Sequence, residues 1–343
     1  MTTLIDIPGR EEYRRKFLRD GFVVIENALQ DQDVGILSRE ADNLMNFLMS
    51  EDVDIMQQLG GVIEPISSGY IDIPLSQMYI FSKTAYSRLR DMVTEEPDSV
   101  TDILFSTMPE WAKVMLPEET EDDKLCLFNE QYIVKTPRSE SVSSFEWHQD
   151  SQYMDASAQN SYPVVSCWTA LDDVNLSNGT LVIEPFPRPM PENKSGYVEL
   201  STKLTNKEEY IKYHQNISSF YETALDPATA VQIAQSAPPN EPEINRPTIG
   251  YIEHFDGTQW TYERQAPVLV DIPAGSVVFM SGFVRHCSIG NRSMKFRRAF
   301  MPQYSIGKVM NAEGGYISLA VPCTVKHEEA GDANMGSGDA DEI

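Results

Sequence analysis

Hydrophobic residues change their spacing about a third of the way along the chain. Early on they recur every three or four residues, as at Val34, Leu37, Ala41 and Leu44, which is the period of a helix with one buried face. From residue 125 onward, short apolar runs rich in β-branched residues alternate with turn signals, which is typical of strands. The pattern predicts helices first and β-structure after them.

The N-terminal third is expected to form helices around a single strand. Helices are expected over residues 11–19, 31–49, 86–92 and 99–113, and the strand over residues 22–29. Gly21 separates the first helix from the strand, and Asp31 or Asp33 is placed to cap the second helix. These elements predict a helical layer at the start of the chain.

The remainder predicts a β-rich domain. Strands are expected over residues 125–137, 162–174, 180–185, 267–280 (as two short pieces), 283–289 and 297–305. Asn178-Gly179 is a hairpin turn signal between two of them. Many short strands with turns between them favour a sandwich or barrel. The predicted fold is mainly β with helices (α+β), a cupin-like double-stranded β-helix or jelly roll with an N-terminal helical layer.

Residues 188–265 interrupt the strand pattern with polar and proline-rich sequence and one helix-like stretch, residues 206–223. A long insertion in a compact domain is usually functional or disordered. We interpret it either as a lid or dimer contact over a cavity mouth, or as a surface decoration. The chain is expected to form a single domain over residues 1–330, followed by an acidic disordered tail at 331–343.

Charge narrows the range of partners. The chain of 343 residues has 27 Lys and Arg against 52 Asp and Glu, a formal net charge of −25. A polyanion repels phosphate backbones and anionic lipids, so neither a nucleic acid nor a membrane is expected as a partner. No apolar run approaches the roughly 20 residues that span a bilayer, and the N-terminus is too charged for a signal peptide. A cytoplasmic protein with a small-molecule substrate is expected, and a homo- or heterodimer stays open.

The cysteines give no sign of a disulfide framework or a zinc site. They are far apart and form no CxxC pair: Cys126, Cys167, Cys287 and Cys323. We expect reduced, packed thiols.

The candidate chemistry starts at EWHQD, where His148 and Asp150 are separated by one residue. On a strand these side chains project to the same side. The pair alone is a weak signal, because a lone histidine is more often a surface or hydrogen-bonded residue. The chain has only five histidines, however, and His286 also follows an apolar, strand-like run. Two histidines and one carboxylate are the facial triad of non-haem Fe(II) oxygenases.

A basic pair follows the second histidine. Arg297 lies 11 residues after His286, with Arg298 next to it. Adjacent strand residues face opposite ways, so only one guanidinium can point inward. A planar guanidinium matches a carboxylate better than an ammonium does.

At this point the chain resembles the phytanoyl-CoA dioxygenase family of Fe(II)- and 2-oxoglutarate-dependent oxygenases. The stretches that carry the resemblance are FLRDGFVVIENAL (17–29), QYIVKTP (131–137), WHQD (147–150), CWTALDDVNLSNGTLVIEP (167–185) and the closing H…N…FRRAFMPQY (286–304). No single stretch is specific, but the combination is, and it spans most of the chain.

The resemblance implies a set of roles. His148, Asp150 and His286 would bind Fe(II), and dioxygen would bind at an open position. Arg297, picked over its neighbour by the family spacing, would hold the distal carboxylate of 2-oxoglutarate. An aspartate at position 150 disfavours halogenation, for which a related enzyme needs a smaller residue there.

Two further cosubstrate contacts are implied at Trp168 and Gln131. For Trp168, a core aromatic on an inner face is an equal alternative. Residues near the motif that would line a substrate pocket, with core packing as the alternative, are Tyr70, Tyr79, Phe145, Tyr153 and Met154.

The chain departs from the family pattern after residue 184. The sequence reads EPFPRPMPENK where the family often has a Pro-Gly-Ser-His segment, and the histidines are 138 residues apart. The insertion contains only scattered lysines and no basic cluster for a coenzyme A phosphate. Phytanoyl-CoA is therefore not carried over as the substrate.

The leading expectation is a dioxygenase that oxidises a small, mostly apolar metabolite, such as a terpenoid or alkaloid intermediate. Hydroxylation is the simplest outcome, with desaturation or oxidative rearrangement as variants. One alternative is a catalytically silent jelly-roll subunit that binds or stabilises a partner oxygenase. Another is a cupin-like metal isomerase or hydrolase, which would not need Arg297.

Overall fold

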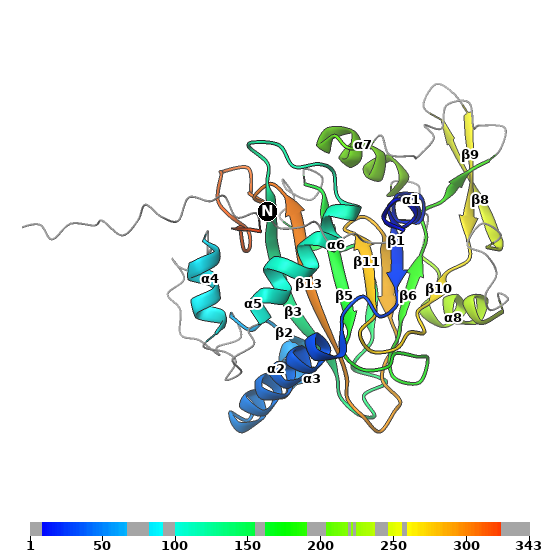
Figure 1. The fold of residues 1–343 in the computed structure, drawn as a ribbon. Helices are drawn as coiled ribbons and strands as arrows, with labels where there is room; N and C mark the ends of the chain where they lie inside the picture. Colours follow the sequence, from blue (N-terminus) through cyan, green and yellow to red (C-terminus); the bar gives the residue numbers. More distant parts are fainter. Residues whose placement is uncertain are drawn as a thin grey trace, which may run out of the picture.

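Three antiparallel sheets and a layer of helices form the computed structural model (Figure 1). It describes residues 9–66, 82–91, 100–154, 162–190, 204–218, 221, 224–236, 246–255 and 259–323. The helices are α1 (Arg10–Asp20), α2 (Asp31–Ser50), α3 (Ile55–Leu59), α4 (Lys83–Arg90), α5 (Val100–Asp102), a π-helical turn (Ile103–Thr107), α6 (Met108–Met115), a 3₁₀ turn (Asp150–Tyr153), α7 (Lys207–Ser218) and α8 (Pro227–Ser236).

The strands are distributed over a large, a small and a peripheral sheet. Those of the large sheet are β1 (Phe22–Ile25), β2 (Val62–Ile63), β3 (Leu125–Lys135), β5 (Val164–Ala170), β11 (Val277–Ser281), β13 (Arg297–Ile306) and β14 (Val321–Pro322). Those of the small sheet are β4 (Phe145–His148), β6 (Leu181–Glu184), β10 (Val268–Leu269) and β12 (Arg285–Ser288). The peripheral sheet contains β7 (Arg188–Pro189), β8 (Thr248–Phe255) and β9 (Gln259–Gln265).

The large sheet has the order β1-β11-β5-β13-β3-β14, with β2 also paired to β3. Alternate residues of its strands face two different environments. On β3, Tyr132 and Val134 join the core under the helices, whereas Gln131 and Ile133 face a cavity. Figure 1 shows the helical layer, including α2 and α6, on one side of β3, β13 and β5. The opposite side of this sheet is therefore the one that can carry a ligand site.

The small sheet, ordered β10-β6-β12-β4, covers that second side. A second core lies between the sheets and joins Trp168 of β5 to Ile183 of β6 and Met301 of β13. The Asn178-Gly179 turn is present, but the expected hairpin is wrong, because β5 and β6 belong to different sheets. The turn carries the chain from one layer to the other, as a jelly roll requires, so the predicted fold class is confirmed.

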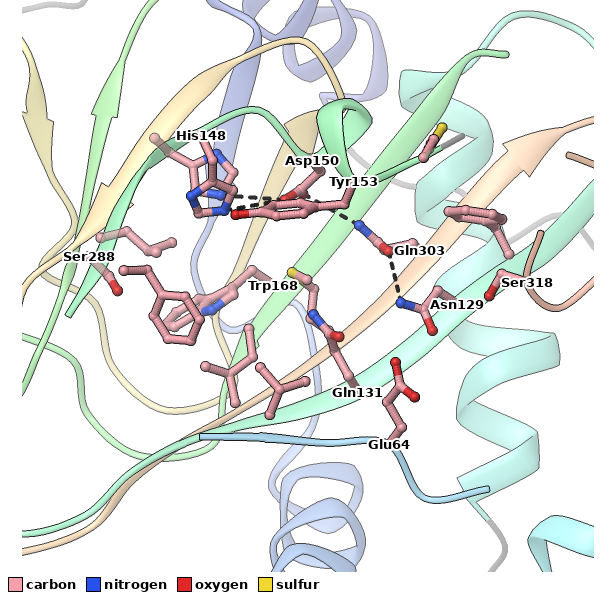
Figure 2. Close-up of a pocket in the computed structure, with 18 of the residues that line it drawn as sticks. Glu64, Asn129, Gln131, His148, Asp150, Tyr153, Trp168, Ser288, Gln303 and Ser318 are labelled. Carbon is pink, nitrogen blue, oxygen red and sulfur yellow. Dashed lines mark hydrogen bonds and ion pairs between the residues drawn. The ribbon is translucent and has the colours of Figure 1, made fainter. Parts of the chain in front are cut away.

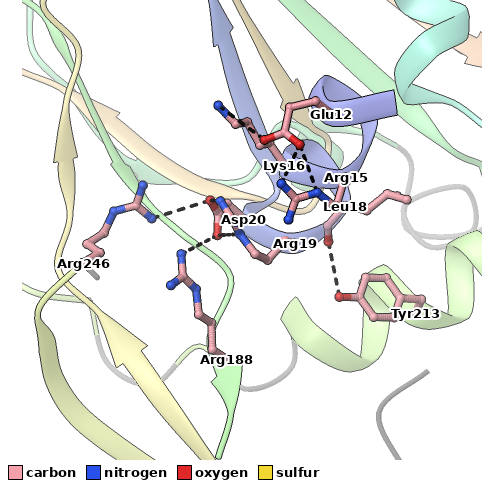
Figure 3. Close-up of polar contacts among 9 residues, drawn as sticks. All are labelled: Glu12, Arg15, Lys16, Leu18, Arg19, Asp20, Arg188, Tyr213 and Arg246. Atoms are coloured by element: carbon pink, nitrogen blue, oxygen red, sulfur yellow. Dashed lines mark hydrogen bonds and ion pairs between the residues drawn. The ribbon is translucent and has the colours of Figure 1, made fainter. Parts of the chain in front are cut away.

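The insertion is attached to helix α1 by ion pairs (Figure 3). Asp20 is buried and pairs with Arg188 of β7 at 3.0 Å and with Arg246, just before β8, at 3.8 Å. From α7, the Tyr213 hydroxyl donates to the Leu18 carbonyl at 3.2 Å. The described parts of the insertion thus pack on the domain.

Several element boundaries differ from the sequence expectation. β1 ends at Ile25, because Asn27 adopts a left-handed conformation with φ of 52°. The predicted capping of α2 is wrong: Asp31 lies inside the first turn, where a carboxylate still favours the helix dipole, and Gln30 precedes it without a side-chain cap. Helix α8 and the peripheral sheet were not predicted. The expected tail lies outside the described residues.

Two expectations on composition can be compared with the structure. All four cysteines are buried and free, as predicted. None of the helices in the described part of the chain combines the length and the apolar character needed to cross a bilayer.

Candidate metal and cosubstrate site

Two histidines face each other across neighbouring strands of the small sheet. β4 pairs with β12, and the register places His148 directly opposite His286. Residues opposite each other in an antiparallel pair project to the same face, with Cβ atoms about 5 Å apart. The imidazole centroids are 4.2 Å apart. Oδ1 of Asp150 lies 3.6 Å from Nε2 of each ring, and Figure 2 shows Asp150 beside His148 at one end of a cavity.

The local structure that aims Asp150 differs from the sequence expectation of one strand carrying both residues. β4 ends at His148, and Asp150 is the first residue of a 3₁₀ turn. Gln149 between them is still extended, with φ of −116° and ψ of 136°. The strand alternation therefore persists for one residue beyond the sheet, which is enough to bring the carboxylate alongside the imidazole.

Each histidine is oriented by its other ring nitrogen. Nδ1 of His148 lies 2.7 Å from the carbonyl oxygen of Glu146, and Nδ1 of His286 lies 3.2 Å from that of Val284. A carbonyl oxygen only accepts hydrogen bonds, so Nδ1 carries the proton in both neutral rings and Nε2 keeps its lone pair. This is the tautomer that a metal ligand needs.

The three donor groups fit a divalent transition metal. One ligand atom from each lies within 4.8 Å of the others, and no second such group of His, Cys, Asp or Glu occurs in the described ranges. Burial lowers the pKa of His286 to about 4, so its ring is neutral at pH 7. Two imidazoles and one carboxylate with open positions beside them are typical of non-haem Fe(II) oxygenases.

Arg297, at the start of β13, places a charge on the wall of the same cavity. Its side chain is fully buried, and Nη2 donates to the Gly179 carbonyl at 3.1 Å. Nε and Nη1 have no hydrogen-bond partner among the described residues. Burial lowers the pKa of Arg297 to about 9, which still leaves it charged at neutral pH. A buried guanidinium with two donors unused fits an anionic ligand such as a carboxylate.

The neighbouring Arg298 points the other way. Its Nη2 lies 2.7 Å from Oδ1 of Asp172, and its Nη1 lies 2.8 Å from Oδ1 of Asp42. These acids raise the pKa of Arg298, chiefly through the hydrogen bonds to Asp172. Of the two arginines that the sequence left in competition, the structure brings Arg297 to the cavity and pairs Arg298 with acids.

A buried lysine stands beside Arg297. Lys135 of β3 is its direct cross-strand partner. Nζ of Lys135 is within hydrogen-bond distance of the Ser143 carbonyl, of the Ser288 hydroxyl at 2.7 Å and of the Ile289 carbonyl at 2.6 Å. Burial, together with the charge on Arg297, lowers the pKa of Lys135 to about 5, so its amine is neutral near pH 7.

The Asn178-Gly179 turn closes this end of the cavity. Gly179 has φ of 95°, and a Cβ there would lie 2.6 Å from Cδ of Lys135 and 2.9 Å from the Ile289 carbonyl oxygen. Only glycine allows the turn to approach so closely and to present its carbonyl to Arg297.

The cavity has a volume of about 550 Å³ and is lined by both of the further cosubstrate candidates, Trp168 and Gln131. The Trp168 ring is buried, and Cζ of Arg297 lies 5.3 Å from the ring centre. The core-aromatic alternative for Trp168 is therefore also satisfied. The Gln131 side chain has no hydrogen-bond partner in the described part of the chain. Contact of either residue with a cosubstrate stays a prediction.

Of the residues expected near a substrate, Phe145, Tyr153 and Met154 line the cavity. Tyr153 is 72% exposed, and its ring centroid lies 5.4 Å from that of His148. Tyr70 and Tyr79 lie outside the described residues.

Four polar residues of the site were not singled out from the sequence. They are Asn129, Lys135, Ser166 and Gln303. Strand alternation carried a usable signal, because Asn129 and Lys135 fall on the same face of β3 as Gln131. The same alternation places Ser166 on the face of Trp168 and Gln303 on the face of Arg297. Their hydrogen-bond partners are more than a dozen residues away, so no local pattern indicates those contacts.

Comparison with known proteins agrees with this class of fold and site. The profile of the phytanoyl-CoA dioxygenase (PhyH) family matches residues 17–299. The chain therefore belongs to this family. No curated protein sequence matches it significantly.

Several solved structures are similar to this chain. EvdO2 from Micromonospora carbonacea var. aurantiaca, complexed with 2-oxoglutarate, is 15% identical with a TM-score of 0.44, and the match covers 90% of this chain and 94% of that one. The α-ketoglutarate-dependent epimerase SnoN from nogalamycin biosynthesis is 14% identical with a TM-score of 0.44, covering 97% and 92%. The carbocyclase SnoK from the same pathway is 14% identical with a TM-score of 0.44, covering 89% and 86%.

Proposed function

We propose that this chain is an Fe(II)- and 2-oxoglutarate-dependent dioxygenase that oxidises a small, mostly apolar metabolite. The observation that carries the proposal is the meeting of two features in one cavity. The His148, Asp150 and His286 donors stand at one side, and Arg297 offers unused donors on the wall. A metal isomerase or hydrolase needs the first feature only.

In this proposal the triad holds Fe(II), and Arg297 binds the distal carboxylate of 2-oxoglutarate through its fork. Trp168 and Gln131 complete the cosubstrate pocket. Bound iron, 2-oxoglutarate and dioxygen supply the oxidising chemistry, in which the keto acid yields succinate and carbon dioxide. The chain's own part is to orient the cosubstrate, exclude water and hold the substrate beside the open coordination positions.

The cavity favours a neutral, compact substrate. Its volume of about 550 Å³ suits a molecule of natural-product size. Its apolar lining includes Phe128, Met154 and Ile317, and Arg297 is the only lysine or arginine among the described lining residues. This supports a natural-product intermediate such as a terpenoid or alkaloid, and it disfavours a coenzyme A ester, whose phosphates need cations. Hydroxylation is the proposed reaction, with desaturation or rearrangement as variants.

Anaerobic titration with Fe(II) and 2-oxoglutarate tests the proposal. The wild-type protein should develop a metal-to-ligand charge-transfer band, and His148→Ala should lose it with its iron affinity. Arg297→Lys should weaken 2-oxoglutarate binding markedly, because an ammonium supplies one arm of the fork. Arg298→Lys is the matched control on the outer face and should bind the cosubstrate as wild type does.

Oxygen uptake separates the enzyme from the silent subunit. An active dioxygenase consumes dioxygen in the presence of 2-oxoglutarate, and a substrate from a metabolite panel increases the rate. No charge-transfer band, together with equal iron binding by His148→Ala and wild type, would overturn the proposed function. Uptake that appears only with a co-expressed oxygenase would favour the silent subunit.

A further inference from the structure

The two carboxylate oxygens of Asp150 have different surroundings. Oδ1 lies 3.6 Å from Nε2 of both His148 and His286. Oδ2 points away from the histidines and accepts a short hydrogen bond from the Ser166 hydroxyl and a longer one, 3.4 Å, from Nε2 of Gln303. One oxygen is thus exposed to the metal position, and the other is engaged by the protein.

The two donors belong to a polar row that crosses the large sheet. Ser166 on β5 is the cross-strand partner of Gln303 on β13, and Gln303 is in turn the partner of Asn129 on β3. Ser166 and Gln303 are buried. The Gln303 amide nitrogen lies 2.8 Å from the Ser166 oxygen, and Nδ2 of Asn129 lies 3.3 Å from Oε1 of Gln303. Figure 2 shows Asp150, Gln303 and Asn129 connected in this order.

The carboxylate fixes the direction of every hydrogen bond in the row. An ionised carboxylate only accepts, so Ser166 must give it the single hydroxyl proton. The Ser166 oxygen can then only accept from Gln303, which turns the Gln303 carbonyl toward Asn129. Asn129 must therefore donate and keeps its own Oδ1 on the far side of its amide. The amide orientations follow from chemistry, without a choice at each residue.

We propose that Ser166 and Gln303, supported by Asn129, are positioning residues that keep Asp150 a one-oxygen metal ligand. This rests on the proposed function, because it concerns the same metal. Without the two donors, Asp150 is free to rotate and offer both oxygens to the ion. That would occupy a position which the cosubstrate or dioxygen needs. Partners of metal ligands of this kind typically change metal affinity about 10- to 100-fold when removed.

Loading with Co(II) provides a readout independent of turnover. Co(II) takes octahedral or five-coordinate sites with distinct visible absorption, and its dissociation constant can be measured by titration. Ser166→Ala and Gln303→Met should each raise the dissociation constant about 10-fold or more. Both should also change the visible spectrum, because the coordination of Asp150 changes. Ser166→Thr, which keeps the hydroxyl, should restore affinity and spectrum.

The row itself supplies graded controls. Asn129→Leu removes the outermost member, which does not touch Asp150, and should change Co(II) affinity by less than about 3-fold, smaller than the effects at the two residues that do. Met301→Leu alters the same cavity wall of β13 without touching the row and should bind as wild type does. If Gln303→Met fails to fold, Gln303→Asn makes the same test, because the shorter side chain withdraws its amide from the carboxylate.

The outcomes distinguish the positioning role of Ser166 and Gln303 from the proposed metal-dependent function. Wild-type binding of Co(II), its loss in His148→Ala, and unchanged affinity and spectrum in Ser166→Ala and Gln303→Met would overturn the positioning role while the metal site stands. Failure of the wild-type protein to bind Co(II) or Fe(II) would overturn both. Equal weakening by Met301→Leu would reduce the effect to general packing and also overturn the positioning role.

Discussion

Two arginines are completely buried on opposite faces of the large sheet, and they differ in what meets their charge. Arg90 of α4 lies under the helical layer, in contact with Glu40 of α2 and 3.1 Å from Glu130 of β3. The Tyr86 hydroxyl donates to Glu130 at 2.7 Å, and the Tyr132 hydroxyl donates to Glu40 at 2.9 Å. Arg90 is therefore held between two acidic side chains supplied by the chain.

Arg297, on the cavity face, is met by a single carbonyl oxygen. Unused nitrogens alone do not distinguish the two residues, because Nε and Nη1 of Arg90 also lack hydrogen-bond partners among the described residues. The difference is the counter-charge: two carboxylates lie within salt-bridge distance of Arg90, whereas no described carboxylate forms an ion pair with Arg297. Removing one partner of a buried ion pair leaves the other charge uncompensated, whereas a buried charge left open in a cavity is a candidate for binding a ligand of opposite charge.

The largest effect is expected from removing the neutralised charge. Arg90→Met leaves two carboxylates buried without a cation and should lower the free energy of unfolding by about 3–5 kcal/mol. Arg297→Met removes a charge that has no ion-pair partner among the described residues and should change the free energy of unfolding by less than about 1.5 kcal/mol. Urea unfolding without ligands measures both.

A triple variant refines this contrast. Neutralising both acids as Glu40→Gln and Glu130→Gln in the Arg90→Met background should recover part of the loss, because no buried charge remains. Equal losses in Arg90→Met and Arg297→Met would show that the two sites do not differ as described.

The Arg90 site should also make stability depend on pH, because it has two carboxylates for one cation. Burial raises the pKa of Glu130 from 4.5 to about 7. A carboxyl group with a raised pKa binds its proton more tightly in the folded state. Its stabilising contribution is complete below pH 4.5 and is lost as the pH rises through 7.

This loss should amount to about 3 kcal/mol, because a rise of the pKa from 4.5 to about 7 on folding corresponds to that difference in proton binding. Unfolding measured between pH 5 and pH 8 should show wild-type stability falling relative to Glu130→Gln. The Gln variant is the control, since it cannot ionise. Parallel pH profiles for the two proteins would show that Glu130 is not the group whose protonation stabilises the fold.

A somewhat smaller effect on stability is expected when 2-oxoglutarate binds beside Arg297. With a bound divalent metal and 2-oxoglutarate at 100 times its dissociation constant, ligand linkage stabilises the folded protein by about 2.7 kcal/mol. Anaerobic thermal unfolding should show this gain in wild type and in Arg298→Lys. Arg297→Met should gain nothing at the same concentration. A full gain in Arg297→Met would show that the carboxylate binds elsewhere.

Local sequence patterns could suggest candidate residues for the cavity, but they could not suggest the Arg90 site. His148 and Asp150 are two residues apart, so alternation places them on the same side, and Arg297 and Arg298 are adjacent, so only one of them can face inward. Asp150 reaches the side of His148 although it lies beyond the strand end, because Gln149 keeps an extended backbone. Assignment of roles came from the family resemblance.

The Arg90 site depends on contacts that no local pattern records. The Tyr132 hydroxyl and Glu40 are 92 residues apart, and Arg90 and Glu40 are 50 apart. Ser166 and Gln303 are 137 residues apart and meet only through the pairing of β5 with β13. The same topology sends β5 and β6 to different sheets across a turn that locally favours a hairpin. Helix packing decides the first of these contacts and sheet order the others, and single-sequence patterns specify neither.

The smallest effect is expected for Arg298, the arginine that faces away from the cavity. Arg298 is partly accessible and pairs with Asp172 and with Asp42, whose side chain is 54% exposed. Solvent screens such pairs, so Arg298→Lys should lower the free energy of unfolding by no more than about 1 kcal/mol. The loss should shrink further in high salt, because added ions screen the remaining attraction between these accessible charges. Urea unfolding at low and high ionic strength measures it, with Asp42→Asn as the matched change on the acidic side. If Arg298→Lys lowered the free energy of unfolding as much as Arg90→Met does, the ion pairs of Arg298 would be as important for stability as those of Arg90. The distinction between the neutralised Arg90, the open Arg297 and the solvated Arg298 would then be wrong.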